Sequence, residues 1–326
     1  MIGPLLTQTV NETLHAAARA GSPSVECSLD LERSRTTVEV GAEGWVWQGR
    51  RFPHLEACKD RTIYHWAGET FRPVARFTTS LIKLVPTQWG PPTFEIDGIK
   101  MLATARVSPY ADAERKVGLI QPRGKVILDT CGGLGYFAAW CLLGQAKQVL
   151  SYEKAADVIW LRRLNPWSPE VGGRLTLTQG DIAEQIETLP ADSVDAVLHD
   201  PPRFGIAGEL YSQDFYDQLA RVLKRRGKLF HYTGAPNRLT SGRDVPNEVA
   251  KRLRRAGFVA ETRNVLNTYQ LSHQRRRLRR CNSRLKSASF SSSPRSLTTD
   301  PACCRLSSPT HGNPLHAAAL ITLIEV

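Results

Sequence analysis

The sequence predicts an α/β fold in which a doubly wound, mostly parallel sheet is covered by helices on both faces. From about residue 111 to 267, short apolar runs alternate with segments of helical character. Strands that alternate with helices in this way form βαβ units with parallel strands. A glycine-rich turn follows the first apolar run, and acidic residues end several of the runs. We expect a small β-rich module before this domain and a disordered tail after it.

The elements of the predicted domain follow one another in a regular order. A short helix over residues 111–120 precedes the first strand. Apolar runs predict strands at 125–130, 148–154, 175–180, 195–200, 228–234 and 259–265. Segments between and after them predict helices at 136–145, 156–165, 214–227 and 245–258.

Composition shifts divide the chain into four parts. Residues 1–80 hold the β-rich module, because alternating residues and glycines over 24–52 predict short antiparallel strands and hairpins. Residues 81–110 form a proline-rich connector or a lid, in which Trp89 and Phe94 offer flat surfaces to a planar substrate. Residues 111–267 form the α/β domain. Residues 268–326 are rich in Arg and Ser, poor in apolar residues, and predicted to be disordered.

Net charge and cysteine content set limits on the class of protein. The net charge is +12, but the tail carries nine basic and two acidic residues from Tyr269 onward. The body is therefore only mildly basic, which is compatible with an RNA substrate without requiring one. The seven cysteines lack paired metal-ligand spacing, so we expect reduced thiols and no metal site. No apolar run is long enough to cross a membrane, and a cytoplasmic protein is expected.

The glycine turn after the first strand carries the strongest chemical signal. It reads Asp129-x-x-Gly132-Gly133-x-Gly135, with an acid placed before the glycines. A dinucleotide binds its pyrophosphate at the following helix N-terminus, where a carboxylate would repel it. S-adenosyl-L-methionine has no phosphate and carries a sulfonium and an ammonium group. Asp129 therefore favours this cationic ligand over NAD.

Three further strands also end on acids. Glu153 ends the second strand, where a carboxylate can accept both ribose hydroxyls of a nucleoside. Asp181 follows the third strand, at the place of an adenine amino group, with Ile182 as an apolar contact. Asp200 ends the fourth strand. Because ligands of open α/β sheets bind beyond the carboxyl ends of the strands, we expect the four acids to converge on one crevice.

These motifs together resemble a known family. LDTCGGLGY, LNPWS, GD and HDPPRFGIAGELYSQDFY, preceded by VPTQWGPPTFEIDGIKM, are similar to class I, Rossmann-like, S-adenosylmethionine-dependent methyltransferases, and in particular to a predicted group common in archaea. Such domains end in a hairpin of a sixth and a seventh strand, and no seventh strand is recognisable near residues 265–271. The cofactor-binding residues that follow are Asp129, Cys131, Gly132, Gly133, Gly135, Glu153, Asp181, Ile182 and Asp200.

The resemblance also implies a place for the methyl acceptor. Related enzymes with an acid or amide, two prolines and an aromatic residue hold a nitrogen nucleophile there, although here Arg203 stands before the aromatic residue. The two prolines stiffen the loop, and in-line displacement depends chiefly on orientation. His199 is a candidate base with packing inside the strand as the alternative, and His231 is a second candidate. The catalytic candidates are thus Asp200, Pro201, Pro202, Phe204 and His199.

The sequence leaves other functions open. GIAGELYSQDFYDQL resembles the segment after the catalytic acid of polyamine synthases, which transfer an aminopropyl group from decarboxylated S-adenosylmethionine. Arg203 beside Asp200 disfavours their polycationic acceptor. A non-enzymatic nucleic-acid-binding protein is the other alternative, but acids at the strand ends would repel phosphates. For a methyltransferase, an RNA base and a small metabolite both remain possible acceptors, and the sequence does not predict an oligomeric state.

Overall fold

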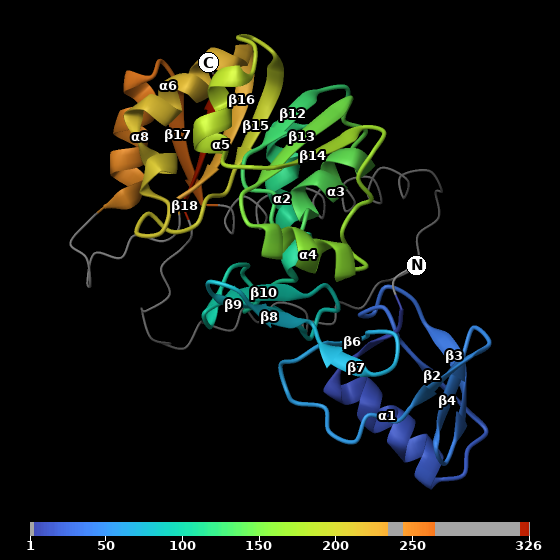
Figure 1. Ribbon diagram of the computed structural model, residues 1–326. Coiled ribbons are helices and arrows are strands. Elements are labelled where there is room, and N and C mark those ends of the chain that lie inside the picture. Colours follow the sequence, from blue (N-terminus) through green and yellow to red (C-terminus); the bar gives the residue numbers. More distant parts are fainter. Residues whose placement is uncertain (1–2, 234–243, 265–319, 326) are drawn as a thin grey trace, which may run out of the picture.

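The computed structural model describes residues 3–233, 244–264 and 320–325, the last six and residues 261–264 by their backbone alone. The strands form three small antiparallel sheets and one sheet of seven strands. Figure 1 shows the seven-stranded sheet between two groups of helices, with the three small sheets below it. The N-terminal part of the chain thus lies to one side of the α/β domain.

The N-terminal module combines two small sheets with one helix. β1 (Leu5–Leu6), β6 (Tyr64–Trp66) and β7 (Phe71–Pro73) form the first sheet. β2 (Ser24–Cys27), β3 (Thr36–Gly41), β4 (Gly44–Trp47) and β5 (Arg50–Pro53) form a meander. The expected hairpins over residues 24–52 are therefore confirmed.

One helix of this module was not predicted. α1 (Gln8–Arg19) begins after Thr7, whose hydroxyl accepts a hydrogen bond from the Val10 N–H and caps the helix. Its buried face includes Leu14 and packs against a core in which the rings of Trp45 and Phe52 stack 4.7 Å apart. Large aromatic side chains supply much of the apolar burial that a module of this size needs.

The connector forms a sheet of its own. β8 (Ala75–Phe77), β9 (Leu81–Val85), β10 (Thr93–Ile96) and β11 (Ile99–Lys100) pair in sequence as an antiparallel meander. The predicted boundary between residues 80 and 81 lies in the hairpin between β8 and β9. In the proline-rich turn between β9 and β10, Gly90, Pro91 and Pro92 are buried, whereas Trp89 is exposed.

The main sheet contains five parallel strands in the predicted positions. They are β12 (Val126–Asp129), β13 (Gln148–Glu153), β14 (Leu175–Gln179), β15 (Val194–His199) and β16 (Leu223–Tyr232), in the spatial order β14-β13-β12-β15-β16. The direction of winding reverses between β12 and β15. A crevice opens at such a reversal beyond the carboxyl ends of the strands, and ligands bind there.

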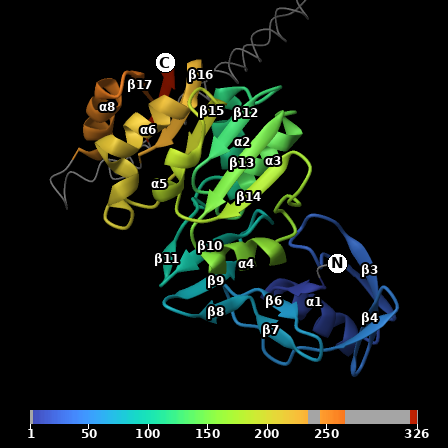
Figure 2. The same ribbon diagram turned by 45° about the horizontal axis from the view of Figure 1, so that its top comes forward.

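Helices cover both faces of this sheet. α2 (Pro109–Ile120), α3 (Tyr136–Leu143) and α4 (Ala156–Leu164) pack on the face that carries Ile127 and Leu198. α5 (Ile182–Gln185), α6 (Gln213–Val222) and α8 (Val245–Arg255) pack on the face that carries Leu128 and Val197. Figure 2 shows the second group on the side of the sheet away from α3. Side chains that alternate between the two faces, all fully buried, explain why the strands are continuous apolar runs.

The sheet is completed by two strands from the end of the chain. β17 (Val259–Asn264) is the predicted sixth strand, and β18 (Leu320–Glu325) lies antiparallel between β16 and β17. The missing seventh strand is therefore found, but in the segment predicted to be a disordered tail. The rest of that segment, residues 268–319, lies outside the described residues. An apolar run embedded in a long Arg- and Ser-rich stretch gave no sequence signal for this pairing.

One further boundary differs from the prediction. The helix expected over residues 214–227 ends at Val222, and β16 begins at Leu223. Arg226 has φ 65°, a left-handed conformation that a helix cannot contain. The fold class itself, a doubly wound and mostly parallel sheet with a β-rich N-terminal module, is confirmed by the topology. Within the described ranges, no helix is long and apolar enough to span a membrane.

Because β18 connects β16 with β17, a proline in its centre is expected to destabilise the domain. Thr322 pairs with His231 on one side and with Thr262 on the other. Thr322→Pro removes a ladder N–H and should lower the free energy of unfolding by on the order of 2 kcal/mol, or Tm by roughly 4–8 °C. Thr322→Val keeps the N–H and serves as the control in thermal denaturation followed by circular dichroism. Equal Tm values for the two variants would contradict the pairing.

Candidate active site

Four acids stand at the carboxyl ends of neighbouring strands, as the sequence predicts. Asp129 ends β12, Glu153 ends β13, Asp181 caps α5 after β14, and Asp200 follows β15. The strands that carry these acids point toward the small sheets of the N-terminal part (Figure 1). The acids therefore lie along one edge of the sheet, next to the connector.

The glycine turn is held tightly against its own domain. The Gly132 N–H donates to the Tyr152 carbonyl at 2.7 Å, and a Cβ at this position would meet the Ser151 hydroxyl at 2.5 Å. At Gly135, φ is +82° and a Cβ would lie 2.6 Å from the Cζ of Arg162. Glycine is thus required at both positions by close packing, and at Gly135 by the backbone conformation as well.

Asp129 is buried beneath this turn. One carboxylate oxygen accepts a hydrogen bond from the Ser151 hydroxyl at 2.9 Å, and the other has no partner among the described residues. The pKa of Asp129 is raised to about 6, chiefly by burial and also by the charges of Glu153 and Asp200, while the Ser151 hydrogen bond and the charge of Arg162 lower it. The charges of Glu153 and Asp200 both act on Asp129, as expected from the positions of the three acids at their strand ends.

Glu153 holds the glycine turn to the start of α4. Its two carboxylate oxygens accept hydrogen bonds from the Gly133 N–H at 2.8 Å and from the Ala155 N–H at 2.9 Å. Burial raises the pKa of Glu153, and these backbone bonds lower it. Each carboxylate oxygen can accept a second bond, so the predicted role toward ribose hydroxyls stays a prediction.

Asp181 stands apart from the other three acids. It accepts a hydrogen bond from the Ala183 N–H at 2.9 Å and so caps α5, and it forms an ion pair of 2.7 Å with Lys154. Ile182 next to it is buried in the core beneath α5 and α6. Lys154 is largely exposed, so this pair lies at the outer margin of the site.

Two buried cations, which were not predicted from the sequence, balance these acids. Arg162 on α4 lies against the glycine turn, and burial lowers its pKa while the charges of Asp129 and Glu153 raise it. Lys116 on α2 lies 2.9 Å from Asp200 and 2.9 Å from Asp112. A possible signal was Asp112 four residues before Lys116, a spacing that places both side chains on one helix face.

The loop after Asp200 is fixed by packing. Pro201 is buried, and the Pro202 carbonyl accepts a hydrogen bond of 3.0 Å from the Tyr211 hydroxyl, at the end of the short 3₁₀ helix Gly208–Tyr211. The ring of Phe204 packs edge-on against that of Tyr211 at 5.5 Å. Phe204 is thus in contact with the protein, and stacking on an acceptor stays a prediction.

His199 is enclosed within the sheet. Its Nε2–H donates to the Leu210 carbonyl at 3.0 Å, so its Nδ1 accepts from the Thr130 hydroxyl at 2.7 Å. Its ring lies 4.4 Å from that of His231, whose Nε2 accepts from the Tyr216 hydroxyl at 3.0 Å. Both histidines are fully buried, and burial lowers the pKa of His199 to about 4. These contacts show that both rings are packed inside the domain. Both ring nitrogens of His199 are bound to protein groups, so neither faces a methyl acceptor.

The LNPWS segment after α4 supports the glycine turn from behind. The Ser168 hydroxyl donates to the Leu134 carbonyl at 2.7 Å, inside the turn. The Asn165 amide donates to the Tyr136 hydroxyl at 3.2 Å, at the first residue of α3. Both ends of the turn are therefore fixed by side chains of one short segment.

The same segment joins the domain to the N-terminal parts. The Trp167 indole donates to the Leu31 carbonyl of the N-terminal module at 2.9 Å. The Tyr136 hydroxyl donates to the Pro92 carbonyl of the connector at 2.8 Å. Phe94 of the connector lies 3.8 Å from the position of a Cβ on Gly133. The connector thus forms a packed wall beside the glycine turn.

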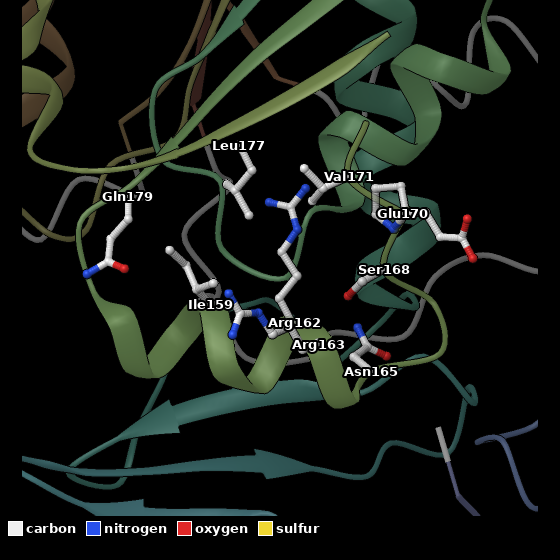
Figure 3. Close-up of a pocket in the computed structure, with 10 residues that line it drawn as sticks. Ile159, Arg162, Arg163, Asn165, Ser168, Glu170, Val171, Leu177 and Gln179 are labelled. Carbon is white, nitrogen blue, oxygen red and sulfur yellow. The ribbon is translucent and has the colours of Figure 1, made fainter. Parts of the chain in front are cut away.

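A cavity of about 560 Å³ lies behind the turn, between α4 and β14. Figure 3 shows Leu177 and Gln179 above α4, opposite Ile159 and the two arginines of that helix. None of the four strand-end acids is among the residues that line this cavity. We therefore place the candidate site at the strand ends and not in this cavity.

The strand-end residues fit the predicted S-adenosyl-L-methionine. The two buried cations have four carboxylates around them. Asp112 and Asp200 act on Lys116, and Asp129 and Glu153 act on Arg162. The excess of negative charge favours a ligand with a sulfonium and an ammonium group and disfavours pyrophosphate. The unpartnered oxygen of Asp129 offers a hydrogen-bond acceptor for such a cation.

Comparison with known proteins is consistent with this geometry. Residues 143–266 match the model of a family described as S-adenosyl-L-methionine-dependent methyltransferase. An uncharacterized protein of Methanocaldococcus jannaschii is 42% identical over 194 residues, which cover 59% of this chain and 66% of that protein. The alignment therefore spans just under two thirds of the relative's length.

Two solved structures are more distantly similar. The spermidine synthase of Thermotoga maritima is 18% identical, with 58% of this chain and 65% of that chain covered and a TM-score of 0.46. An S-adenosylmethionine-dependent methyltransferase of Mesorhizobium loti is 15% identical, with 66% and 96% covered and a TM-score of 0.41. Neither similarity bears on the reaction of this chain. The family match over residues 143–266 agrees with the predicted S-adenosyl-L-methionine-dependent methyltransferase family.

The buried histidine pair predicts a loss of stability in acid. The folded pKa of His199 lies below its unfolded value of 6.5, so the unfolded state binds more protons between pH 6.5 and about 4. The free energy of unfolding should fall over this range by on the order of 3 kcal/mol on account of His199. His199→Gln cannot titrate and should show a shallower decline in urea denaturation at pH 7, 5.5 and 4. The raised pKa of Asp129 stabilises the folded state as the pH falls, but it does so equally in both proteins. An identical decline in the free energy of unfolding of wild type and His199→Gln would contradict a neutral, buried His199.

Proposed function

We propose that the chain is a class I S-adenosyl-L-methionine-dependent methyltransferase and that it transfers a methyl group to a nitrogen atom held beside Asp200. The observation that supports the proposal best is the unpartnered, buried oxygen of Asp129 among an excess of carboxylates. A site of this kind stabilises a cationic ligand at the glycine turn. The acceptor is an RNA base or a small metabolite.

Residues along the sheet edge would hold the cofactor in three parts. Asp129 and the turn from Cys131 to Gly135 would bind the methionine part, through the free carboxylate oxygen and the backbone. Glu153 would accept bonds from the ribose hydroxyls with its remaining lone pairs. Asp181 and Ile182 would contact the adenine. S-adenosyl-L-methionine supplies an electrophilic methyl group on a positively charged sulfur.

Asp200 and the adjacent proline backbone would orient the acceptor nitrogen. Oδ2 of Asp200 already accepts a hydrogen bond from Lys116, so we assign the N–H of the acceptor to Oδ1. Pro201 and Pro202 limit the conformations of the loop, so its carbonyl groups hold their directions. His199 has both ring nitrogens bound inside the domain, and we assign it no proton transfer.

The chemistry asked of these residues is mainly positioning. Methyl transfer from a sulfonium releases a neutral thioether, so the leaving group needs no acid. The acceptor nitrogen becomes positively charged and then loses a proton to Asp200 or to water. Asp200 therefore acts first as a hydrogen-bond acceptor that aims the lone pair of the nitrogen.

The alternative of an aminopropyltransferase is less well supported. Its polycationic acceptor needs free carboxylates, whereas Asp200 and Asp112 both contact Lys116. A nucleic-acid-binding protein without enzymatic activity leaves the buried acids at the strand ends unexplained, because they repel phosphates. NAD is disfavoured by the same acids around the glycine turn.

Ligand titration separates these functions. Calorimetry of the full chain should detect binding of S-adenosyl-L-methionine and not of NAD, because the acids at the strand ends repel a pyrophosphate. Gly135→Ala should weaken binding at least tenfold, because its Cβ would clash with Arg162 at a residue of φ +82°.

The matched control is Gly124→Ala. Gly124 also has positive φ, +71°, but a Cβ there meets nothing within 4 Å. This variant should lose about 1 kcal/mol of stability from backbone strain and keep its affinity for the cofactor. Binding of the decarboxylated form or of NAD in preference to S-adenosyl-L-methionine would refute the proposed function.

The role of Asp200 is testable before the acceptor is known. Tritium transfer from methyl-labelled S-adenosyl-L-methionine is measured on two fractions of a cell extract, purified RNA and a small-molecule filtrate. Asp200→Ala should reduce transfer to the active fraction at least a hundredfold, because the acceptor loses its orienting oxygen. Asp195→Ala, which alters a carboxylate at the opposite end of β15, is the control. Full transfer by Asp200→Ala would remove that role.

A further inference from the structure

Lys116 is an unusual feature of the α/β domain because its ammonium group is buried. The residue is 7% exposed and lies under the sheet edge, on the helix that precedes the first strand of the domain. Its Nζ lies 2.9 Å from the Oδ2 atoms of both Asp112 and Asp200. Fully or nearly buried lysines are rare unless they are paired.

Aromatic rings complete the surroundings of this ammonium group. The ring centroid of Tyr232 on β16 lies 4.4 Å from Nζ, and that of Phe137 on α3 lies 5.7 Å away. Ring faces stabilise a cation where water is excluded. Lys116 is thus held from α2, α3, β16 and the loop after β15, and its charge is part of the site.

We propose that Lys116 is a positioning residue that fixes the Asp200 carboxylate and makes the acceptor site select an uncharged, weakly basic nitrogen over an ammonium group. This inference rests on the proposed function, since it concerns the acceptor of the same site. The nitrogen class that fits is an amino group attached to a heteroaromatic ring, which is uncharged at neutral pH and still carries N–H groups.

The orientation of Asp200 follows from its contact with Lys116. Pro201 and Pro202 restrict the backbone after Asp200, but they do not fix the side chain. The ion pair with Lys116 holds Oδ2, and Asp112, one helical turn away, holds Lys116 in turn. The remaining oxygen of Asp200 therefore has a defined direction, set from α2.

The selection against ammonium groups follows from charge. Asp112 and Asp200 alone would form a dianionic pocket, of the kind that attracts amines in their protonated form. Lys116 reduces the net charge of this cluster to one negative charge and repels a second cation at short distance. A protonated amine also lacks the lone pair that methyl transfer requires, and it would have to lose its proton first. An uncharged amine needs only a hydrogen-bond acceptor, which Asp200 provides.

The experiment compares cation binding in three proteins. Putrescine, a dication, is titrated calorimetrically into wild type, Lys116→Met and Lys224→Met, each saturated with S-adenosylhomocysteine. Lys224 forms a pair of the same length, 2.9 Å, with Asp195 at the opposite end of the sheet, and is the matched control. Putrescine should bind Lys116→Met at least tenfold more tightly than wild type or Lys224→Met. Equal affinity in all three proteins would overturn the selection by charge.

A spectroscopic measurement tests the positioning of Asp200. The carboxyl carbon of Asp200 is followed by NMR during a pH titration of labelled protein. Lys116→Met should raise the pKa of Asp200 by more than one unit, because the cation that lowers it is removed. Lys116→Arg should restore the wild-type titration. An unchanged Asp200 titration in Lys116→Met would show that Lys116 serves packing alone.

A second variant covers the case in which Lys116→Met does not fold. Asp112→Asn keeps the pair between Lys116 and Asp200 and removes one negative charge. The pKa of Asp200 should then fall, because the charge of Asp112 raises it, and putrescine should bind no more tightly than to wild type. A rise in either quantity would contradict the proposal.

Failure of this inference is distinguishable from failure of the proposed function. Binding of S-adenosyl-L-methionine to wild type, measured beforehand, tests the methyltransferase assignment alone. If the cofactor binds but putrescine affinity and the Asp200 titration do not respond to Lys116, only the positioning role is wrong.

Discussion

The structure depends on balancing charge at a buried sheet edge. Parallel strands place their last residues side by side, and here those residues are acids, of which Asp129 is buried and Glu153, Asp181 and Asp200 are half-buried. Unpaired buried carboxylates are costly, so the domain brings Arg162 from α4 and Lys116 from α2 to the same edge. The close packing of the glycine turn against Arg162 and the fixed direction of Asp200 both follow from this balance. The carboxylates outnumber the cations at this edge, so the site favours a positively charged ligand.

The main sheet was predictable because its signal is local. Each parallel strand is an apolar run that ends on an acid or a glycine turn, and the pattern repeats with helices between. The first helix of the chain was missed because its buried face, with Val10, Leu14 and Ala17, is short and stands next to alanines that carry little contrast. β18 was missed for a different reason. Its pairing with β16 and β17 is a contact between distant segments, and a run of six residues gives no indication of which sheet it joins.

The candidate site could be predicted in its acids but not in its cations. Asp129, Glu153 and Asp200 were found because parallel strands share their carboxyl ends, a rule that needs only the strand positions. Lys116 and Arg162 sit within amphipathic helices, where a basic residue normally faces water. Tertiary packing decides which basic residue of a helix is buried. Gly132 and Gly135, for example, leave room for the side chain of Arg162. The environment of His199 likewise required the positions of Thr130 and Leu210, which come from different parts of the chain.

The place of β18 in the sheet has a consequence for biosynthesis. β16 and β17 leave the ribosome before β18, and residues 265–319 separate β17 from β18. Neither strand can therefore pair with β18 while those residues are being made. Over that interval the nascent chain exposes two unpaired edges, which are the surfaces through which chains aggregate or recruit chaperones. Completion of the α/β domain is therefore coupled to translation of the last described segment, and premature termination would release a protein whose sheet lacks its bridging strand.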